Sequence, residues 1–287
     1  MNKWLNKAEY PFAANYFIVN GQKLHYIDEG QGDTILFVHG TPSWSFDMRN
    51  VIKNLSKNYR CIAIDHIGFG LSEKPEYYDY STINHSKTLE KFVVELGLKN
   101  FTMVVHDFGG PIGMNMAINY PEKVKGFVIL NSWLWSCKDD PGYIRLSRVL
   151  KSPLLPFLYK YLNFSPRFIL PRSFGDNKLS RSLLSQYTRP FASKTERNGT
   201  LAFALSLLND QEWFEELWRK RENISAKPAL FIWGTKDAFI TPSYLEKFAS
   251  GFQNATINQM DTSGHFPQEE NPDLVSKLMR EWIGNTY

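Results

Sequence analysis

The 287-residue sequence contains only two cysteines, Cys61 and Cys137. Two isolated cysteines are too few for a disulfide framework or a zinc site. Cys61 lies in the apolar run Cys61–Ile64, so we expect it to be a small, buried hydrophobic residue. The cysteines therefore point to no metal site, and the sequence as a whole implies neither a metal ion nor an organic cofactor.

Long apolar runs and a surplus of one charge are also missing. No run approaches the ~20 apolar residues that span a bilayer, and the segment before Phe12 lacks the apolar region of a signal peptide. The net charge is +4, and the basic stretch Arg219–Arg221 adjoins Glu222, which is typical of a solvated helix face. We expect a cytoplasmic monomer or small homo-oligomer that binds neither nucleic acid nor a membrane.

Short, β-branched apolar runs alternate with helical patterns along most of the chain, which predicts a mostly parallel central sheet flanked by helices. A hairpin comes first, with strands at Phe17–Asn20 and Lys23–Asp28. The later strands are predicted at Thr34–Val38, Arg60–Asp65, Phe101–His106, Val124–Leu130, Ala229–Trp233 and Ala255–Met260. The helices are predicted at Trp44–Ser56, Ser81–Leu96, Gly109–Asn119, Pro242–Phe252 and Pro267–Trp282.

The alternation stops in the middle of the chain. Residues 133–221 contain several helical segments and no convincing strand, and the segments are interrupted by Pro153, Pro156, Pro166, Pro171 and Pro190. We interpret this block as a helical cap inserted into a core domain made of residues 1–132 and 222–287. An insert at this point would lie over the strand ends, where sheets of this class bind ligands.

The most informative segment is Phe101–Gly113, in which an apolar strand runs directly into Asp107 and two glycines open a helix. The pattern matches the strand–turn–helix in which some hydrolases hold a nucleophile, with Asp107 at the serine position and Val105 replacing the first glycine. A simpler interpretation is that Asp107 only caps the helix.

Two later segments favour the catalytic interpretation. Asp237 and His265 each follow a predicted strand, and the order nucleophile, acid, histidine is that of the template. The loop after the strand Thr34–Val38 supplies a further element. Backbone N–H groups of Thr41 and Phe108 would then form the oxyanion hole. We predict Asp107, Asp237 and His265 as the catalytic residues.

Several blocks of the sequence resemble haloalkane dehalogenases and their close relatives. They are His39–Phe46, Asp65–Ser72, His106–Gly110 and Trp233–Asp237, and their order also matches. The resemblance implies an α/β-hydrolase fold, an aspartate nucleophile and a small apolar substrate with water as cosubstrate. Epoxide hydrolases and β-lactone decarboxylases share most of these blocks, so they remain alternatives.

The resemblance fails at two positions. The family usually holds the departing halide with Asn or Glu after the His-Gly pair and with Trp after the nucleophile, whereas this chain has Thr41 and Phe108. Further candidates for the leaving-group pocket are Trp133, Trp135 and Tyr187. An epoxide would need a proton donor, for which the sequence offers cap tyrosines: Tyr143, Tyr159, Tyr161 and Tyr187.

A carboxylate nucleophile suits displacement at a saturated carbon, because a typical aspartate, with a pKa near ~3.9, is ionised at neutral pH without help from a base. The product would be an ester on Asp107, which water activated by His265 would hydrolyse. A serine esterase is disfavoured, since no serine occupies the turn. The other alternative is a non-catalytic binding protein with the same fold, but the presence of Asp107, Asp237 and His265 argues against it.

Overall fold

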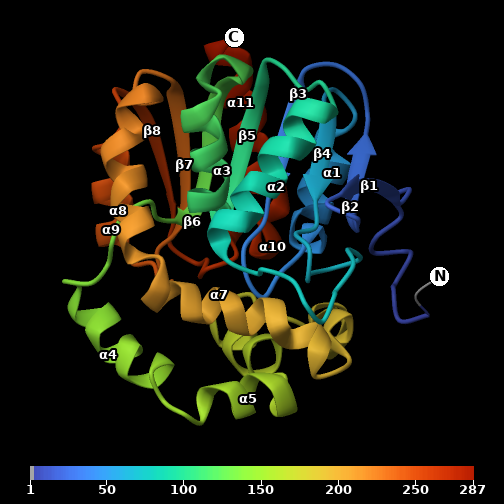
Figure 1. Ribbon diagram of the computed structural model, residues 1–287. Coiled ribbons are helices and arrows are strands. Elements are labelled where there is room, and N and C mark those ends of the chain that lie inside the picture. Colours follow the sequence, from blue (N-terminus) through green and yellow to red (C-terminus); the bar gives the residue numbers. More distant parts are fainter. Residues whose placement is uncertain (1–2) are drawn as a thin grey trace.

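The computed structural model describes residues 3–287 and contains an eight-stranded sheet in the order β1-β2-β4-β3-β5-β6-β7-β8 (Figure 1). The strands are β1 (Asn15–Val19), β2 (Gln22–Glu29), β3 (Thr34–Val38), β4 (Arg60–Ile64), β5 (Phe101–Asp107), β6 (Val124–Ser132), β7 (Pro228–Gly234) and β8 (Asn254–Met260). β2 pairs antiparallel with β1 and β4, and every later pairing is parallel. The predicted mostly parallel sheet is confirmed.

The central strands are buried on both faces, as their continuous apolar sequences predict. Every residue of β5 is buried. Both β5 and β6 are longer than predicted. β5 continues to Asp107 and β6 to Ser132, and these two last residues pair with each other in the sheet. The nucleophile candidate is therefore the last residue of the central strand.

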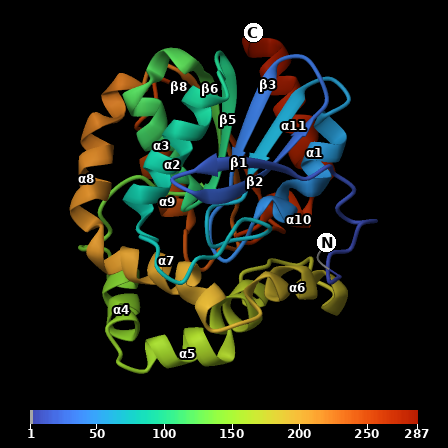
Figure 2. The ribbon, with the colours of Figure 1, turned by 45° about the vertical axis from the view of Figure 1, so that its right-hand side comes forward.

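Helices cover both faces of the sheet (Figures 1 and 2). α2 (Thr82–Glu95), α3 (Gly109–Asn119) and α9 (Pro242–Ala249) pack on one face; α1 (Arg49–Leu55), α10 (Pro267–Glu270) and α11 (Pro272–Thr286) pack on the other. Two predicted helices differ from the structure. The first opens with the 3-10 turn Ser45–Met48, and the last is divided at Asn271, whose helical conformation the following Pro272 disfavours.

Between β6 and β7 the chain forms α4 (Pro141–Leu150), α5 (Leu155–Leu162), α6 (Arg181–Thr188), α7 (Asn198–Asn209) and α8 (Gln211–Lys220). We call α4–α7 the cap, because these helices lie beyond one end of the sheet in both views (Figures 1 and 2). α8, which the sequence assigned to the same block, packs beside α3 instead. None of the helices in the described residues combines the length and apolar character needed to cross a bilayer.

Candidate active site

Asp107 occupies a sharp turn between β5 and α3. Its φ angle is 52°, in the left-handed region that a residue with a side chain rarely adopts. Two glycines make the turn possible: a Cβ atom on Gly109 would collide with the Val38 backbone, and one on Gly40 would collide with the Asp107 side chain. The glycine-rich sequence thus allows the backbone to hold Asp107 in a strained position at the end of the sheet.

The three predicted catalytic side chains meet. His265 Nδ1 lies 2.6 Å from Asp237 Oδ2, and His265 Nε2 lies 3.4 Å from Asp107 Oδ2. All three are largely buried, with exposed fractions of 7% for Asp107, 3% for Asp237 and 5% for His265. An imidazole held between two carboxylates, one of them at a strained turn, is the arrangement that nucleophilic catalysis with a histidine base requires.

The two carboxylates control the charge of His265. Burial opposes protonation of the imidazole, but Asp237 and Asp107 outweigh burial and raise the pKa of His265 to about 10. Burial likewise opposes ionisation of Asp237, yet the charge and hydrogen bond of His265 hold the pKa of Asp237 below its usual value. At neutral pH the resting site therefore contains a protonated imidazole between the carboxylates.

Asp237 accepts hydrogen bonds from several directions, which fixes its orientation. Its Oδ1 accepts from the backbone N–H groups of Phe239 and Ile240 at 2.8 and 3.1 Å. Its Oδ2 accepts from the Asn131 side chain at 3.0 Å, and Asn131 in turn binds both backbone polar groups of Gly234. Asn131 is therefore a positioning residue, which the sequence patterns above did not identify.

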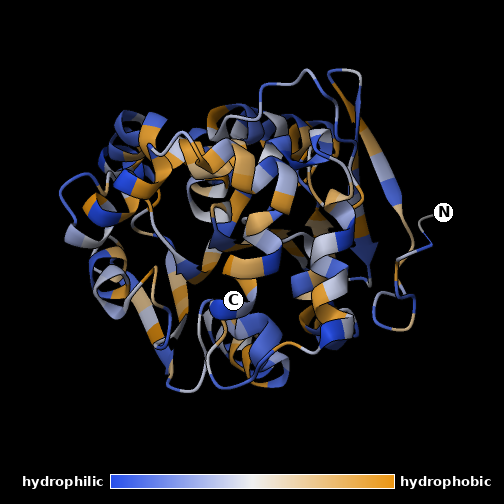
Figure 3. Cartoon of the chain, turned by 90° about the horizontal axis from the view of Figure 1, so that it is seen from below, coloured by the Kyte–Doolittle hydropathy of each residue, from blue (hydrophilic) through white to orange (hydrophobic). Residues whose placement is uncertain are grey.

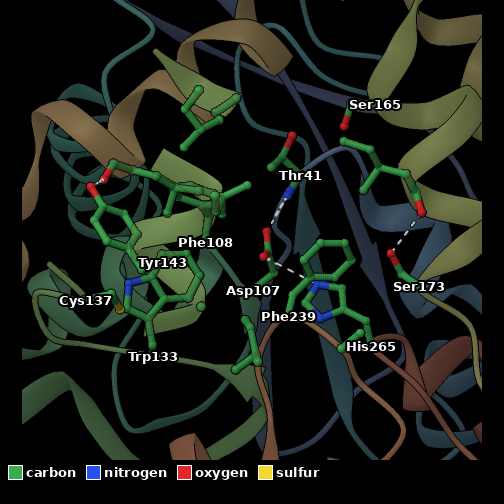
Figure 4. A pocket seen from close by; sticks show the side chains of 18 of the residues that line it. Thr41, Asp107, Phe108, Trp133, Cys137, Tyr143, Ser165, Ser173, Phe239 and His265 are labelled. Carbon is green, nitrogen blue, oxygen red and sulfur yellow. Dashed lines mark hydrogen bonds and ion pairs between the residues drawn. The ribbon is translucent and has the colours of Figure 1, made fainter. Parts of the chain in front are cut away.

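Thr41 is the closest neighbour of the Asp107 carboxylate on the other side. Its backbone N–H donates to Asp107 Oδ1 at 2.8 Å (Figure 4), as the predicted oxyanion hole requires. Its hydroxyl is buried and has no hydrogen-bond partner within residues 3–287. Phe108 opens α3, and its ring packs against Trp133 at a centroid distance of 4.8 Å. The Phe108 side chain thus supplies an apolar wall and no donor.

A cavity of about 420 Å³ lies between the sheet and the cap and reaches Asp107, Thr41 and His265. Apart from the catalytic residues, its wall is mostly apolar, with contributions from the cap and from the loop after β7. The residues that form much of this wall are Pro42, Phe108, Trp133, Leu146, Leu150, Ile169, Ala204, Leu207, Phe239, Ile240 and Phe266. The volume suits a small or medium apolar molecule.

Two predicted pocket residues do not reach this cavity, so those predictions are wrong. Trp135 packs against Trp218 and Tyr244 between the core helices. Tyr187 is fully buried, because α6 directs its side chain toward the core, and its hydroxyl donates a hydrogen bond to Glu269. Sequence patterns cannot show which way a cap helix faces, and an aromatic ring near the entrance packs equally well elsewhere.

Trp133 does line the cavity. Its indole N–H is buried without an acceptor among the described residues. In Figure 4 this nitrogen lies on the side of Cys137 and away from Asp107. Of the cap tyrosines, Tyr143 and Tyr159 line the cavity, and the Tyr143 hydroxyl already donates to the Leu207 carbonyl at 2.6 Å.

The loop that carries His265 is held by the cap. The His265 backbone N–H donates to the carbonyl of Ser173, a cap residue, at 2.7 Å. The Glu270 carboxylate accepts from Gly264 N–H at 2.7 Å and from Gly175 N–H at 2.9 Å, and thereby joins the histidine loop to the cap. Burial raises the pKa of Glu270 to about 7. Nothing in the sequence distinguishes Glu270 from an ordinary helix carboxylate, so sequence analysis missed it.

Two histidines that adjoin the functional loops support them. His106 Nε2 lies 2.7 Å from the His265 carbonyl oxygen, and His39 Nε2 accepts the backbone N–H of His66 at 3.0 Å. Burial and the adjacent His265 lower the pKa of His106 to about 3, so it is neutral. Within the described residues, no group of three or more metal-ligating side chains is arranged to hold a metal ion.

Comparison with known proteins agrees with this geometry. A family model described as alpha/beta hydrolase fold matches residues 33–272. The chain is 31% identical to haloalkane dehalogenase 2 of Mycobacterium tuberculosis over 96% of both chains. It is 32% identical to a cis-3-alkyl-4-alkyloxetan-2-one decarboxylase of Shewanella oneidensis, over 96% of this chain and 90% of that protein.

Solved structures show the same fold. A haloalkane dehalogenase from Agrobacterium tumefaciens C58 superposes with a TM-score of 0.87 at 23% identity, over 99% of this chain and 100% of the other. A reconstructed ancestral haloalkane dehalogenase gives a TM-score of 0.86 at 25% identity, over 95% and 99% of the two chains. This chain is therefore a member of the α/β-hydrolase family and of its haloalkane dehalogenase-like branch.

Proposed function

We propose that this protein is a hydrolase of the haloalkane dehalogenase type that acts on small or medium apolar molecules with a carbon–halogen bond. One observation carries the proposal: the Asp107 carboxylate reaches an apolar cavity while His265 Nε2 lies 3.4 Å from it. Water is the only cosubstrate, and no metal or cofactor takes part. We expect the enzyme to work in the cytoplasm, with the cap helices α4–α7 of the insert 133–221 closing the site.

In the first step, an Asp107 oxygen attacks the saturated carbon that carries the halogen. The new carbon–oxygen bond forms as the carbon–halogen bond breaks, and the halide leaves with the bonding electron pair. The apolar wall of the cavity favours this reaction, because it excludes water that would otherwise solvate the carboxylate. The product is a neutral ester on Asp107.

Formation of the ester prepares His265 for the second step. The negative charge of Asp107 helps to hold the proton on His265, and the ester removes that charge. The pKa of His265 then falls, and the imidazole can act as a base toward water. The resulting hydroxide attacks the Asp107 carboxyl carbon, and the alcohol leaves. Asp107 retains one oxygen atom from water.

The oxyanion of this second step forms on the side chain of Asp107 itself. The Thr41 N–H already points at Asp107 Oδ1, and we assign the backbone N–H of Phe108 as the second donor. Asp237 stabilises the imidazolium and keeps the Nδ1 proton of His265 in place. These roles use the three predicted catalytic residues and both predicted oxyanion donors.

The leaving group needs a hydrogen-bond donor inside a dry cavity. The hydroxyl of Thr41 is the best placed, because it is buried, unpartnered in the described residues and attached to a residue that already contacts Asp107. Trp133 is a second cavity donor, although its N–H lies on the far side of the ring in Figure 4. Tyr143 is a poor proton donor for epoxide opening, since its hydroxyl already donates to the Leu207 carbonyl.

A second candidate is the processing of a β-lactone. Phe108 offers no side-chain donor to a free halide, and the oxetan-2-one decarboxylase relative is as similar to this chain as the dehalogenase. In a lactone the departing carboxylate stays attached to the substrate carbon chain, so the enzyme has no separate ion to hold. The same Asp107 would then attack a strained ring.

The decisive experiment traps the ester. Replacing His265 with Phe keeps an aromatic ring but removes the base, so incubation with 1-bromoalkanes should add one alkyl group to Asp107 in peptide mass spectra. The variant Asp107→Asn is the control and should stay unmodified. Absence of an adduct on Asp107, with a substrate that the wild type turns over, would refute the proposed nucleophile.

The products separate the substrate classes. Bromide release, diol formation from epoxides, and carbon dioxide with an alkene from a β-lactone are measured in parallel with the wild type and Asp107→Asn. A single turnover in oxygen-18 water should place the label in Asp107 and leave it out of the alcohol. Halide release that persists in Asp107→Asn would show that another group does the chemistry.

A further inference from the structure

The outermost layer of the cap exposes an unusual concentration of apolar side chains. Of the fifteen large hydrophobic residues that are exposed in the described chain, seven lie between Ile144 and Phe168. Helix α5 has the sequence LPFLYKYL and contains a single charged residue, Lys160. A scattered exposed leucine needs no explanation, but apolar residues gathered on one element mark an interaction surface.

Packing shows that these side chains point away from the protein. Leu155 and Tyr159 on α5 pack against Leu201 of α7. Helical periodicity places Phe157 and Tyr161 on the opposite face of α5. Their rings stack at a centroid distance of 4.9 Å and are 47% and 53% exposed. In Figures 1 and 2, α4 and α5 lie on the side of α7 that faces away from the sheet.

The charged residues on α4 and α5 are all basic. The whole chain has 33 basic and 29 acidic residues, yet the segment 141–175 contains six basic residues and no acid. Arg148 and Lys151 on α4 are exposed, and the Lys194 ammonium lies 3.8 Å from the centre of the Tyr161 ring. Figure 3, which views the molecule from the cap side, shows hydrophobic and hydrophilic segments interleaved.

We name the outer cap face by its exposed residues: Ile144, Arg148, Lys151, Leu154, Phe157 and Tyr161. We propose that the outer cap face docks on the surface of an anionic lipid bilayer. Helices that combine basic residues with Phe and Leu lie in the headgroup region of such a bilayer, held by apolar burial and by attraction to anionic lipid. A second copy of this chain fits less well, because two faces of the same positive charge repel each other.

Docking there would place the cavity next to the bilayer. Gly142 and Arg145 on α4 line the cavity and are also exposed, so this helix borders an opening to solvent. An apolar substrate dissolved in lipid would then enter at α4. The expectation of no membrane partner considered only a run that crosses the bilayer, whereas this surface would lie on it. Vesicle binding itself does not depend on the proposed hydrolase activity.

The test is flotation of the full-length protein with phosphatidylcholine vesicles, with and without phosphatidylglycerol. The protein should bind only the anionic vesicles, and added salt should weaken binding, since screening shortens the range of the attraction. The charge variant Arg148→Glu with Lys151→Glu should bind at least ~10-fold more weakly. The control variant Lys87→Glu with Lys99→Glu, on exposed positions of the core, should bind as the wild type does.

The apolar part of the outer cap face is tested separately. Phe157→Ser with Tyr161→Ser should lose vesicle binding, while Tyr16→Ser with Ile18→Ser, at exposed positions on β1, should keep it. Neither cap residue lines the cavity, so turnover of a water-soluble bromoalkane should persist and show that the variant is folded. Absence of binding to anionic vesicles would overturn the proposal. A dimer in sedimentation velocity that the cap variant abolishes would overturn it too, in favour of self-association.

Discussion

His265 Nε2 lies 3.4 Å from Asp107 Oδ2, so the proposed base forms an ion pair with the proposed nucleophile before any substrate arrives. Together with Asp237, that pair raises the pKa of His265 to about 10 against the opposing effect of burial. A protonated imidazole is not a base. Formation of the ester on Asp107 removes one of the two charges that hold the proton, which favours release of the proton and lets His265 act as the base.

We expect Asp107→Asn to lower the pKa of His265, because the substitution removes a neighbouring negative charge just as the ester does. Titration of the His265 ring proton by NMR measures this directly. An unchanged pKa in Asp107→Asn would show that the ion pair does not control the base. Asp261→Asn, at an exposed carboxylate, is the matched control and should leave the titration of His265 unaltered.

The raised pKa also predicts how stability depends on pH. The fold binds the His265 proton more tightly than the unfolded chain does, with a pKa of about 10 against 6.5. The stabilisation from this proton is complete at pH values below the unfolded-state pKa of 6.5. It is lost as the pH rises through the folded-state pKa of about 10. Urea unfolding of the wild type should show this loss, and Asp107→Asn should show a smaller one.

Glu270 gives a second, independent prediction. Its carboxylate joins Gly264 beside His265 to Gly175 in the cap, and burial raises its pKa to about 7. Glu270→Gln keeps one acceptor and loses the other, so we expect a stability loss of about 1.5–3 kcal/mol, the typical value of a hydrogen bond to a charged group. Because the variant loosens the loop of His265, kcat should fall about 10-fold while KM changes little.

The pH dependence distinguishes Glu270 from a general packing defect. The pKa of Glu270 in the folded protein lies above the ordinary glutamate value of 4.5, so the carboxyl stabilises the fold at low pH and this contribution is lost as the pH rises through about 7. Glu270→Gln should remove that part of the stability profile. Glu281→Gln on the exposed face of α11 is the control. A variant Glu270→Gln with normal kcat would show that the histidine loop does not depend on this contact.

The sequence predicted the features that rest on local patterns. The strand before Asp107 and the two glycines after it follow from backbone rules that act within a few residues. Asp237 and His265 were identified because each follows a predicted strand and their order matches a known template. Trp135 and Tyr187 were misplaced, and Glu270 was missed, because their roles depend on how the cap packs. Packing of this kind brings together residues from distant parts of the chain, and no short pattern records it.

Thr41 supplies a prediction about the leaving group. Thr41→Val keeps the backbone N–H that contacts Asp107 and removes only a buried hydroxyl without a partner in the described chain, so the fold should lose little stability. We expect chloride release to slow about 10-fold and bromide release to slow less, because chloride is the poorer leaving group. Thr41→Ser retains the hydroxyl and should retain the rate. Equal rates for Thr41→Val and the wild type with both halides would remove Thr41 from the leaving-group site.

The last prediction concerns the hydrogen bond between Asn131 and Asp237. Asn131 Nδ2 donates at 3.0 Å to Asp237 Oδ2, the same oxygen that accepts from His265 Nδ1. The Asn131 amide and the Asp237 carboxylate are therefore adjacent, on the Nδ1 side of the imidazole. Asp237→Asn alone should reduce kcat up to ~10⁴-fold, because the imidazolium loses its counter-charge and its proton is no longer held on Nδ1. Asn131→Asp alone should impair the site by adding a like charge next to Asp237.

The double variant Asn131→Asp with Asp237→Asn exchanges the two groups across that hydrogen bond and restores the net charge of the site. We therefore expect it to recover at least ~10-fold of the activity that Asp237→Asn loses, measured as halide release under identical conditions. The Gly234 N–H donates to the Asn131 amide oxygen at 2.8 Å, and an aspartate at position 131 also provides an oxygen at that place. If the double variant is no more active than Asp237→Asn, the carboxylate must act from position 237 itself, and the role of Asn131 is limited to orienting it.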